Sequence, residues 1–405
     1  GNDKIGNYQY LYLSVFESGR GYRFGESYNP YPTMREASLA NEDVSWEIAK
    51  KQNYGFDAQL FNGLLGIAFD YFVERRSNIL ATRNTITQVS GVQLDQLPPE
   101  NFGKVNNQGF EIETNLRKSF GDFTVIANGS FFFLLNTIID IDEIKYDLDY
   151  KNQTGKSIGQ HFGYTWSGEY YTHEELGYVW DESVEGANKY VLPEDAAPSV
   201  PVPTVPVYPG DLKFVDRNED GVIDNYDIGA IRNTDRPEFL YGLNYTFQYK
   251  NFALTMFWQG AGGFSRKFHH LTGIEFYNNS KVQEMHLGRW AYYEDPYTGE
   301  LIDTRSTATY PRLQVGGGWG INQNSEFRIY KADYLRLKNI ELSYELPRSL
   351  LDKLGMRRAK IFVNGNNILT FTEVKWIDPE MPRPSSNESI YPQTTFWGAG
   401  INIGF

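Results

Sequence analysis

Alternation of apolar and polar residues at every second position is the feature that most constrains this chain. Residues 242–249 read Gly-Leu-Asn-Tyr-Thr-Phe-Gln-Tyr, so each odd position is apolar or aromatic and each even position is small or polar. The same pattern recurs in residues 54–60, 65–73, 110–117 and 397–405. Successive side chains of a β-strand point to opposite faces of the sheet. The pattern therefore predicts an all-β fold whose strands have one apolar face and one polar face.

About ten strands are predicted from these segments. Their approximate bounds are 7–17, 44–61, 64–80, 104–119, 122–137, 237–250, 252–266, 326–346, 357–372 and 395–405. Most are longer than the five or six residues typical of strands in soluble proteins. The eighth, 326–346, changes phase near Lys338, which predicts a β-bulge or a strand longer than the apolar band.

The connections between these strands alternate between long and short. The short ones cover 61–64, 119–122, 249–252 and 347–356. The long ones cover 18–43, 81–103, 138–236, 267–325 and 373–394. Outer-membrane barrels have tight periplasmic turns and long extracellular loops, whereas a soluble sandwich has no reason to place every long loop at one end. The connections therefore predict a transmembrane antiparallel β-barrel, with a large soluble β-sandwich or β-solenoid as the alternative.

Composition agrees with this prediction and excludes several other classes. Aromatic residues make up 16% of the 405 residues, which suits the aromatic girdles of a membrane barrel. No run of about eighteen apolar residues predicts a transmembrane helix, but a barrel strand needs only every second residue to be apolar. The chain has no cysteine and a formal charge of −13, which exclude disulfides and argue against nucleic-acid binding. No pattern typical of a catalytic site is present, so we expect a protein that is not an enzyme.

One segment within the long connection 138–236 has the spacing of an EF-hand-type calcium loop. Its candidate ligands, at positions 1, 3, 5, 7, 9 and 12 of residues 216–227, are Asp216, Asn218, Asp220, the carbonyl of Val222, Asp224 and Asp227. Gly221 occupies position 6, where such loops turn sharply. Position 12 is Asp instead of Glu, and this shorter side chain reaches less far. We expect a structural calcium ion here, with a metal-free loop of Asx turns as the alternative.

The same connection is rich in aromatic residues. Tyr164, Trp166, Tyr170, Tyr171 and Trp180 are candidate substrate-binding residues. Aromatic faces can stack on sugar rings or pack against peptide side chains. The alternative is that these rings pack the long loop against itself.

A further set of segments stands out along the chain: 101–111, 162–164 with Gly168 and 174–176, 209–224, 334–344, 364–372, 378–380 and the closing strand. Together, and in this order, they resemble one known family, the SusC/RagA-like TonB-dependent outer-membrane transporters of Bacteroidetes. The resemblance implies a 22-stranded barrel closed by an N-terminal plug, of which this chain would contribute the last ten strands.

The resemblance also implies an organisation and partners for the chain. Residues 1–405 would form the C-terminal part of one barrel domain, 138–236 would be an extracellular loop, and the plug would lie outside the chain. The remaining strands, the plug and the TonB-contacting part would come from the same precursor or from another chain. A SusD-like lipoprotein would sit over the loops at 138–236 and 267–325.

The implied function is import of an oligosaccharide or a peptide across the bacterial outer membrane, with the barrel surrounded by lipid. A passive porin-type channel is one alternative. A secreted calcium-dependent glycan-binding β protein is the other.

Overall fold

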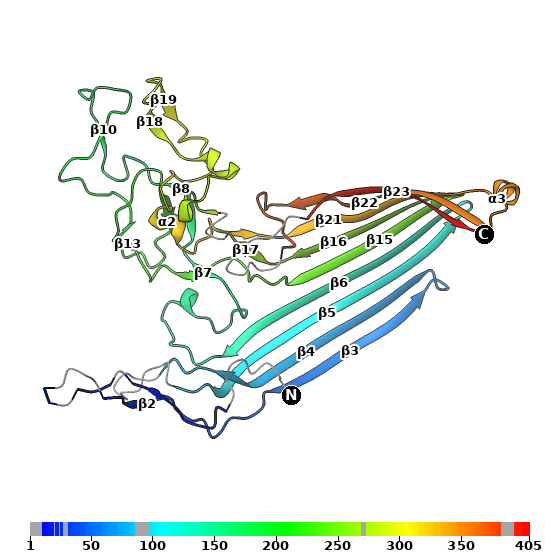
Figure 1. Ribbon diagram of the computed structural model, residues 1–405, viewed down its shortest axis with the longest axis horizontal. Helices are drawn as coiled ribbons and strands as arrows, with labels where there is room; N and C mark the ends of the chain where they lie inside the picture. The colour runs from blue at the N-terminus through cyan, green and yellow to red at the C-terminus, as the bar shows by residue number, and fades with distance from the viewer. Residues whose placement is uncertain are drawn as a thin grey trace. The chain divides into compact units, whose positions relative to one another are not determined.

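The computed structural model describes residues 10–19, 21–23, 25–26, 31–85, 97–268, 273–381 and 393–405. A nine-stranded sheet dominates it, with the strand order β23-β22-β21-β16-β15-β6-β5-β4-β3 (Figure 1). The bounds are β3 (Ile48–Leu60), β4 (Leu65–Ala81), β5 (Glu100–Phe120), β6 (Phe123–Asp140), β15 (Phe239–Tyr249), β16 (Phe252–Gly262), β21 (Tyr334–Glu345), β22 (Arg358–Thr372) and β23 (Phe396–Gly404). Each strand pairs with the one that precedes or follows it among these nine along the chain. The antiparallel all-β fold and nine of the ten predicted strands are therefore confirmed.

The short connections are confirmed as tight turns at one end of the strands. Phe61, Asn62 and Gly63 all have positive φ, at 55°, 56° and 83°. Gly121 and Lys250 also have positive φ in the next two turns. The second and third turns have two residues each, and two-residue hairpins of the primed types require positive φ, because their twist then matches that of the strands. The fourth connection contains the helix α3 (Arg348–Leu354).

Contacts divide the chain into two compact units. Unit 1 comprises residues 1–58, 68–112 and 132–158, and unit 2 comprises 59–67, 113–131 and 159–405. Among the described residues, no helix is long and apolar enough to cross a membrane.

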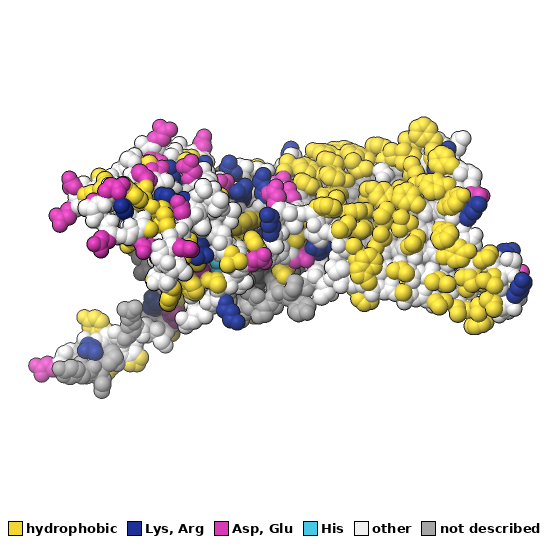
Figure 2. Space-filling model, turned by 90° about the horizontal axis from the view of Figure 1, so that it is seen from above, with side chains coloured by type: hydrophobic (Ala, Val, Ile, Leu, Met, Phe, Trp, Pro, Cys, Tyr) yellow, Lys and Arg dark blue, Asp and Glu magenta, His cyan; other side chains and the backbone are white. Residues whose placement is uncertain are grey.

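The strands of unit 2 have the two predicted faces. On β22, Ile361, Val363 and Phe371 are exposed apolar residues of one face, and the ring of Phe371 stacks on Trp258 of β16 at 6.4 Å. On the opposite face, Lys360 of β22 pairs with Glu341 of β21 at 2.5 Å. Figure 2 shows apolar side chains gathered in a broad area over the sheet. Such an exposed apolar surface is typical of a protein that faces lipid.

Unit 1 shows the same division. Four Phe rings, one from each of β3 to β6, follow one another at centroid distances of 5.5–6.2 Å. They are Phe56, Phe69, Phe110 and Phe133. Elsewhere in this unit, Glu74 of β4 forms ion pairs with Lys51 at 3.0 Å and with Arg76 at 2.8 Å.

The predicted bulge at Lys338 is confirmed. Leu337 and Asn339 pair with Trp258 and Phe257 of β16, while Lys338 has no partner in the ladder. The register also shifts between Leu337 and Asn339 where β21 pairs with β22. The extra residue explains the change of phase in the alternation.

Of the first predicted strand, 7–17, only residues 15–17 are in a strand, which is not part of the large sheet, and residues 7–9 lie outside the described residues. Residues 10–12 form a turn, and β1 (Val15–Ser18) pairs only with β2 (Met34–Ser38). Tyr10, Tyr12 and Phe16 alternate with apolar neighbours, so this segment has no polar face that would mark it as a strand of the large sheet.

Two other predicted strands are each divided into two shorter strands. The predicted 252–266 divides at Gly263, which has a φ of 70°, into β16 and β17 (Ser265–Lys267). The predicted 326–346 divides into β20 (Ile329–Lys331) and β21. β17 and β20 pair with each other in a sheet of their own.

The long connections of unit 2 fold together. We call residues 159–236 and 263–333 the loop subdomain, of which 269–272 lie outside the described residues. Its further pairs are β7 (Phe162–Gly163) with β14 (Gly229–Ala230), β8 (Trp166–Tyr170) with β12 (Leu212–Phe214), β9 (Val179–Trp180) with β10 (Tyr190–Val191), β11 (Val202–Pro203) with β13 (Val222–Ile223), and β18 (Tyr292–Glu294) with β19 (Leu301–Asp303). Its buried core is Tyr164, Leu212, Phe214, Ile223, Phe268, Ile274, Met285, Tyr310, Ile321 and Phe327.

Candidate metal loop and the loop subdomain

The predicted calcium loop, residues 216–227, lies between β12 and β14. Asp216 at position 1 accepts hydrogen bonds from the backbone N–H groups of Glu219 at 2.7 Å and Gly221 at 2.8 Å. Asp220 accepts one from Val222 at 2.9 Å, and Asn218 donates to Asp220 at 2.8 Å. Gly221 has a φ of 87°, a conformation that other residues rarely adopt.

Asp227 closes the loop from position 12. Its two carboxylate oxygens accept the N–H groups of Arg217 at 2.7 Å and Asp224 at 2.8 Å. Its side chain is fully buried, and no ion pair to it is found among the described residues. Burial raises the pKa of the nearby Tyr164, and the charges of Asp227 and Asp224 raise it further.

The loop is anchored in the core of the loop subdomain. Ile223, in the middle of the loop, is fully buried, and β13 pairs in parallel with β11. The conformation of the loop is thus coupled to the packing around Tyr164 and Phe214.

The donor chemistry of this loop fits a hard cation such as Ca²⁺. All the predicted ligands offer oxygen, and a carboxylate oxygen that accepts one N–H bond retains a second lone pair. Across the described ranges, however, no three or more His, Asp or Glu side chains come together as a metal-holding group. Ligation would therefore need the side chains of this loop to turn toward a common centre.

Two of the predicted substrate-binding aromatics are core residues. Tyr164 is 3% exposed and stacks on Phe214 at 5.0 Å. Tyr171 is 1% exposed, and its hydroxyl donates to the carbonyl of Pro201 at 2.9 Å. A ring without an exposed face cannot stack on a substrate, so the packing alternative describes these two residues.

The other three aromatics divide between two clusters. Trp166 and Tyr170 are half-buried against the same core, and Trp166 meets Phe327 edge-on at 5.1 Å. Trp180 is 47% exposed, and its indole N–H donates to Glu182 at 2.6 Å. The structure therefore brings Tyr164, Trp166 and Tyr170 together and leaves Trp180 apart from them, next to Tyr190.

A histidine cluster that the sequence did not reveal joins the two long loops. His173 stacks on Tyr190 at 4.0 Å and meets Trp290 and Tyr292 at 5.6 and 5.4 Å. Burial lowers the pKa of His173 to about 4, so its ring is neutral near pH 7. More than a hundred residues separate His173 from Trp290 along the chain, and no local sequence pattern predicts their contact.

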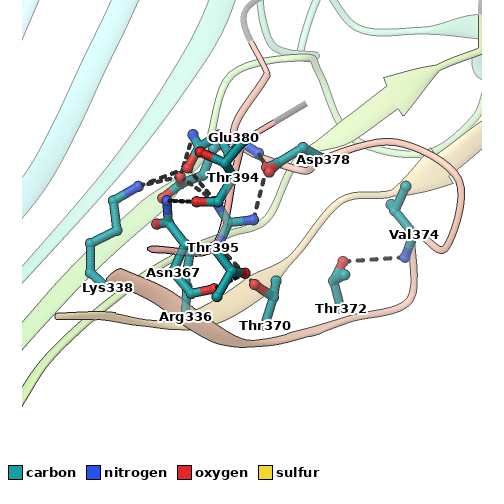
Figure 3. A network of polar contacts seen from close by, with 11 residues as sticks. Arg336, Lys338, Asn367, Thr370, Thr372, Val374, Asp378, Glu380, Thr394 and Thr395 are labelled. Carbon is teal, nitrogen blue, oxygen red and sulfur yellow. Dashed lines mark hydrogen bonds and ion pairs between the residues drawn. The ribbon is translucent and has the colours of Figure 1, made fainter. Parts of the chain in front are cut away.

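A second unpredicted feature is a charged network on β21 (Figure 3). The side chain of Arg336 is 3% exposed and donates to Asp378 at 2.9 Å, Glu380 at 2.6 Å and Thr370 at 2.8 Å. Lys338 also pairs with Glu380, at 2.5 Å. Burial alone would raise the pKa of Glu380, but the hydrogen bond from Lys338 and the charges of Arg336 and Lys338 hold it below its usual value. The network ties the segment after β22 to the wall strand β21.

Similarity searches relate the chain to TonB-dependent receptors. It is 27% identical over 395 residues to TonB-dependent receptor P3 of Formosa agariphila, covering 91% of this chain and 35% of that protein. It is 23% identical over 424 residues to TonB-dependent receptor SusC of Bacteroides thetaiotaomicron, covering 100% of this chain and 36% of that protein. The chain thus spans about a third of the length of these curated relatives. No family model matches the chain.

The fold is also similar to that of solved structures of outer-membrane transporters. The RagAB peptide transporter superposes with a TM-score of 0.63 at 20% identity, covering 100% of this chain and 40% of that chain. The RagAB peptide importer in the open-open state superposes with a TM-score of 0.62 at 19% identity, again over 100% of this chain and 39% of that chain.

The fold is that of the wall of an outer-membrane β-barrel, and the chain is similar over its length to TonB-dependent receptors, which places it in the bacterial outer membrane. The resemblance to SusC/RagA-like transporters that the sequence motifs indicate is confirmed.

Proposed function

We propose that the chain forms part of the barrel wall and the extracellular loops of a TonB-dependent nutrient importer. The observation that carries this proposal is the superposition on RagAB over the full length of the chain. The apolar face of the sheet suits lipid, and the polar face suits a solvated lumen. The named relatives are TonB-dependent receptors, which supports energy-dependent import over a passive porin and over a secreted glycan-binding protein.

The remaining strands and the plug are proposed to come from the rest of the same protein or from another chain. β3 and β23 are the two edges of the nine-stranded sheet. An unpaired strand edge in lipid leaves backbone groups without hydrogen bonds, so the barrel needs further strands to close. The short share of each relative that the chain spans supports this proposal.

The substrate is proposed to be an oligosaccharide or a peptide, delivered with a SusD-like lipoprotein above the loops. The structural neighbour is a peptide importer, which supports the peptide class. Among the five predicted aromatic contacts, Trp180 has the exposed ring that a substrate contact requires.

A structural Ca²⁺ ion is proposed for residues 216–227. The side chains of Asp216, Asn218, Asp220, Asp224 and Asp227 and the carbonyl of Val222 would hold it. Because Ile223 is part of the core, an ion here would stiffen the loop subdomain rather than take part in transport chemistry.

Uptake by the full-length transporter tests the proposed function. Cells that express it should accumulate a labelled oligosaccharide or peptide when TonB is present, and deletion of TonB should abolish the accumulation. Uptake that is unchanged without TonB would instead establish a passive channel. Growth on defined glycan or peptide sources distinguishes the two substrate classes.

A further inference from the structure

Two hairpins from different long loops form one surface at the end of the loop subdomain. We call residues 173–195 and 290–305 the hairpin tip; it contains the β9–β10 and β18–β19 hairpins. The N–H of Ala187 donates to Glu294 at 2.5 Å, and the rings of Tyr190 and Tyr292 lie 5.6 Å apart. His173 packs between the two hairpins, so the tip has a small aromatic core of its own.

The outer surface of the hairpin tip carries large apolar side chains that no described residue covers. Tyr297, in the turn between β18 and β19, is 96% exposed. Besides Trp180, the proposed substrate contact, the other exposed apolar residues are Val179, Leu192, Tyr293 and Leu301. Aromatic and aliphatic groups exposed together in this way are typical of the centre of a protein–protein interface.

The hairpin tip also concentrates the negative charge of the chain. Its 39 residues include eleven Asp or Glu and two Lys or Arg, a formal charge of −9 out of −13 for all 405 residues. Figure 2 shows acidic side chains at this end flanking apolar ones.

Both basic residues of the tip are already paired within it. Lys189 pairs with Glu182 at 2.8 Å, and Arg305 pairs with Asp303 at 2.9 Å. Several other acidic side chains of the tip have no ion pair in the described part of the chain, among them Glu185, Glu194, Asp195 and Glu300.

We propose that the hairpin tip docks a protein whose contacting face presents Lys and Arg around an apolar centre. A neutral or acidic face would have to desolvate these carboxylates without a compensating charge, which opposes binding. A basic face pairs them and is also steered toward the tip before contact. Anionic surfaces, such as phosphate-bearing lipid headgroups, are repelled by the same charge.

This inference rests on the proposed function, because it assigns the basic face to the lipoprotein partner. In that assembly, the apolar residues supply the contact that slows dissociation, and the acidic residues set the orientation and the rate of association.

The test uses the full-length transporter in detergent and the lipoprotein that copurifies with it, purified separately as the probe. The first variant combines Glu185→Lys, Glu194→Lys and Asp195→Lys, and the second is Tyr297→Ala. Asp352→Lys, on α3 at the opposite end of the strands, is the control for charge reversal away from the tip. Association and dissociation rates are measured at several salt concentrations.

We expect the triple variant to associate about tenfold or more slowly at low salt, with a weaker salt dependence than the wild type. Tyr297→Ala should dissociate about tenfold faster with little change in the association rate. Asp352→Lys should match the wild type. Because every substituted side chain is on the surface, the heat-dependent gel mobility of the folded barrel should remain unchanged in all variants.

Unchanged rates for the triple variant and for Tyr297→Ala would overturn the docking inference and leave TonB-dependent import intact. Absence of any binding by the wild-type transporter would overturn both the inference and the proposed lipoprotein partnership. A binding loss in Asp352→Lys equal to that of the triple variant would also overturn the inference, because it would show a general effect of charge.

Discussion

At the scale of single residues, buried ionisable groups decide how the loop subdomain responds to its surroundings. Asp227 is fully buried and is held only by the N–H groups of Arg217 and Asp224 among the described residues. A buried carboxylate with only backbone partners is costly unless a cation compensates it. Asp227 therefore has two roles: its hydrogen bonds close the loop, and its carboxylate is a ligand of the proposed ion.

Asp227→Asn tests this role. The substitution removes one charge and one of the two acceptors, so we expect Ca²⁺ affinity to fall at least about tenfold and the loop subdomain to lose about 1.5–3 kcal/mol of stability. Calorimetric titration of the full-length protein with Ca²⁺ measures the first effect, and hydrogen exchange of residues 216–227 measures the second. Asp147→Asn, in an exposed segment, is the control, and equal Ca²⁺ binding by both variants would contradict the proposed site.

His173 predicts a dependence on pH. Burial lowers its pKa to about 4 against an unperturbed value near 6.5, with Glu174 and Asp303 opposing the shift and Arg305 adding to it. The neutral ring thus contributes stability above pH 6.5, and this contribution is lost as the pH falls toward 4, to a limit of about 3 kcal/mol.

Hydrogen exchange of the β9–β10 hairpin between pH 7 and pH 4, corrected for the intrinsic exchange rate, measures this loss. Protection should fall with pH in the wild type and remain nearly constant in His173→Phe. Equal pH dependence in both proteins would contradict the assignment to His173.

The six candidate ligands of the metal loop could be named from the sequence because they lie within twelve consecutive residues, and their role stays a prediction. The sequence could not predict that Tyr164 and Tyr171 are core residues. Their burial depends on partners such as Phe214 and Pro201, which lie thirty or more residues away along the chain. His173 and Trp290 illustrate the same limit over a longer separation.

At the scale of elements, the wall strands were predictable and the short ladders were not. β15 alternates over most of its eleven residues, because Tyr241, Leu243, Tyr245, Phe247 and Tyr249 are separated by small or polar residues. β7, β9 and β13 have two residues each, too few for any period to show. The failure of 7–17 has a related cause, since apolar residues at consecutive positions leave no contrast between faces.

The two faces of β22 give a direct prediction about its environment. Val363 lies on the apolar face and Asn366 on the polar face of the same strand. Val363→Arg should cost about 2–4 kcal/mol and reduce the yield of folded barrel, because a charge on the lipid face is expensive. Asn366→Arg should fold normally. Heat-dependent gel mobility of the full-length variants measures the folded fraction, and equal yields would contradict the assignment of the faces.

The Arg336 network joins β21 to the segment that follows β22. Arg336→Gln removes the cation that pairs with Asp378 and Glu380, while both carboxylates stay buried. The segment 373–381 should therefore loosen, at a cost of about 3–5 kcal/mol. The double variant with Glu380→Gln should recover part of this loss, because one unpaired charge is removed.

Hydrogen exchange of residues 373–381 is the measurement for these variants. Arg358→Gln, which breaks the exposed pair with Glu345, is the control and should cost less than about 1 kcal/mol. Equal protection of the segment in Arg336→Gln and Arg358→Gln would show that the network does not hold it.

At the scale of the whole molecule, charge and hydrophobicity are separated along the chain. Large exposed apolar side chains are frequent on the nine strands, while most of the net charge of −13 belongs to the hairpin tip. The average charge and hydrophobicity of the whole chain therefore describe neither the nine strands nor the hairpin tip. The alternation of short and long connections made this separation predictable, but the folding of two long loops into one subdomain depends on contacts between distant residues.

The most direct test of the proposed wall of a larger barrel is a cryo-electron microscopy structure of the full-length protein. We predict that β3 and β23 each pair along their free edges with strands from outside residues 1–405, in a closed barrel whose polar face surrounds a plug. A structure in which these nine strands close on themselves, or in which either edge remains free in the membrane, would contradict it.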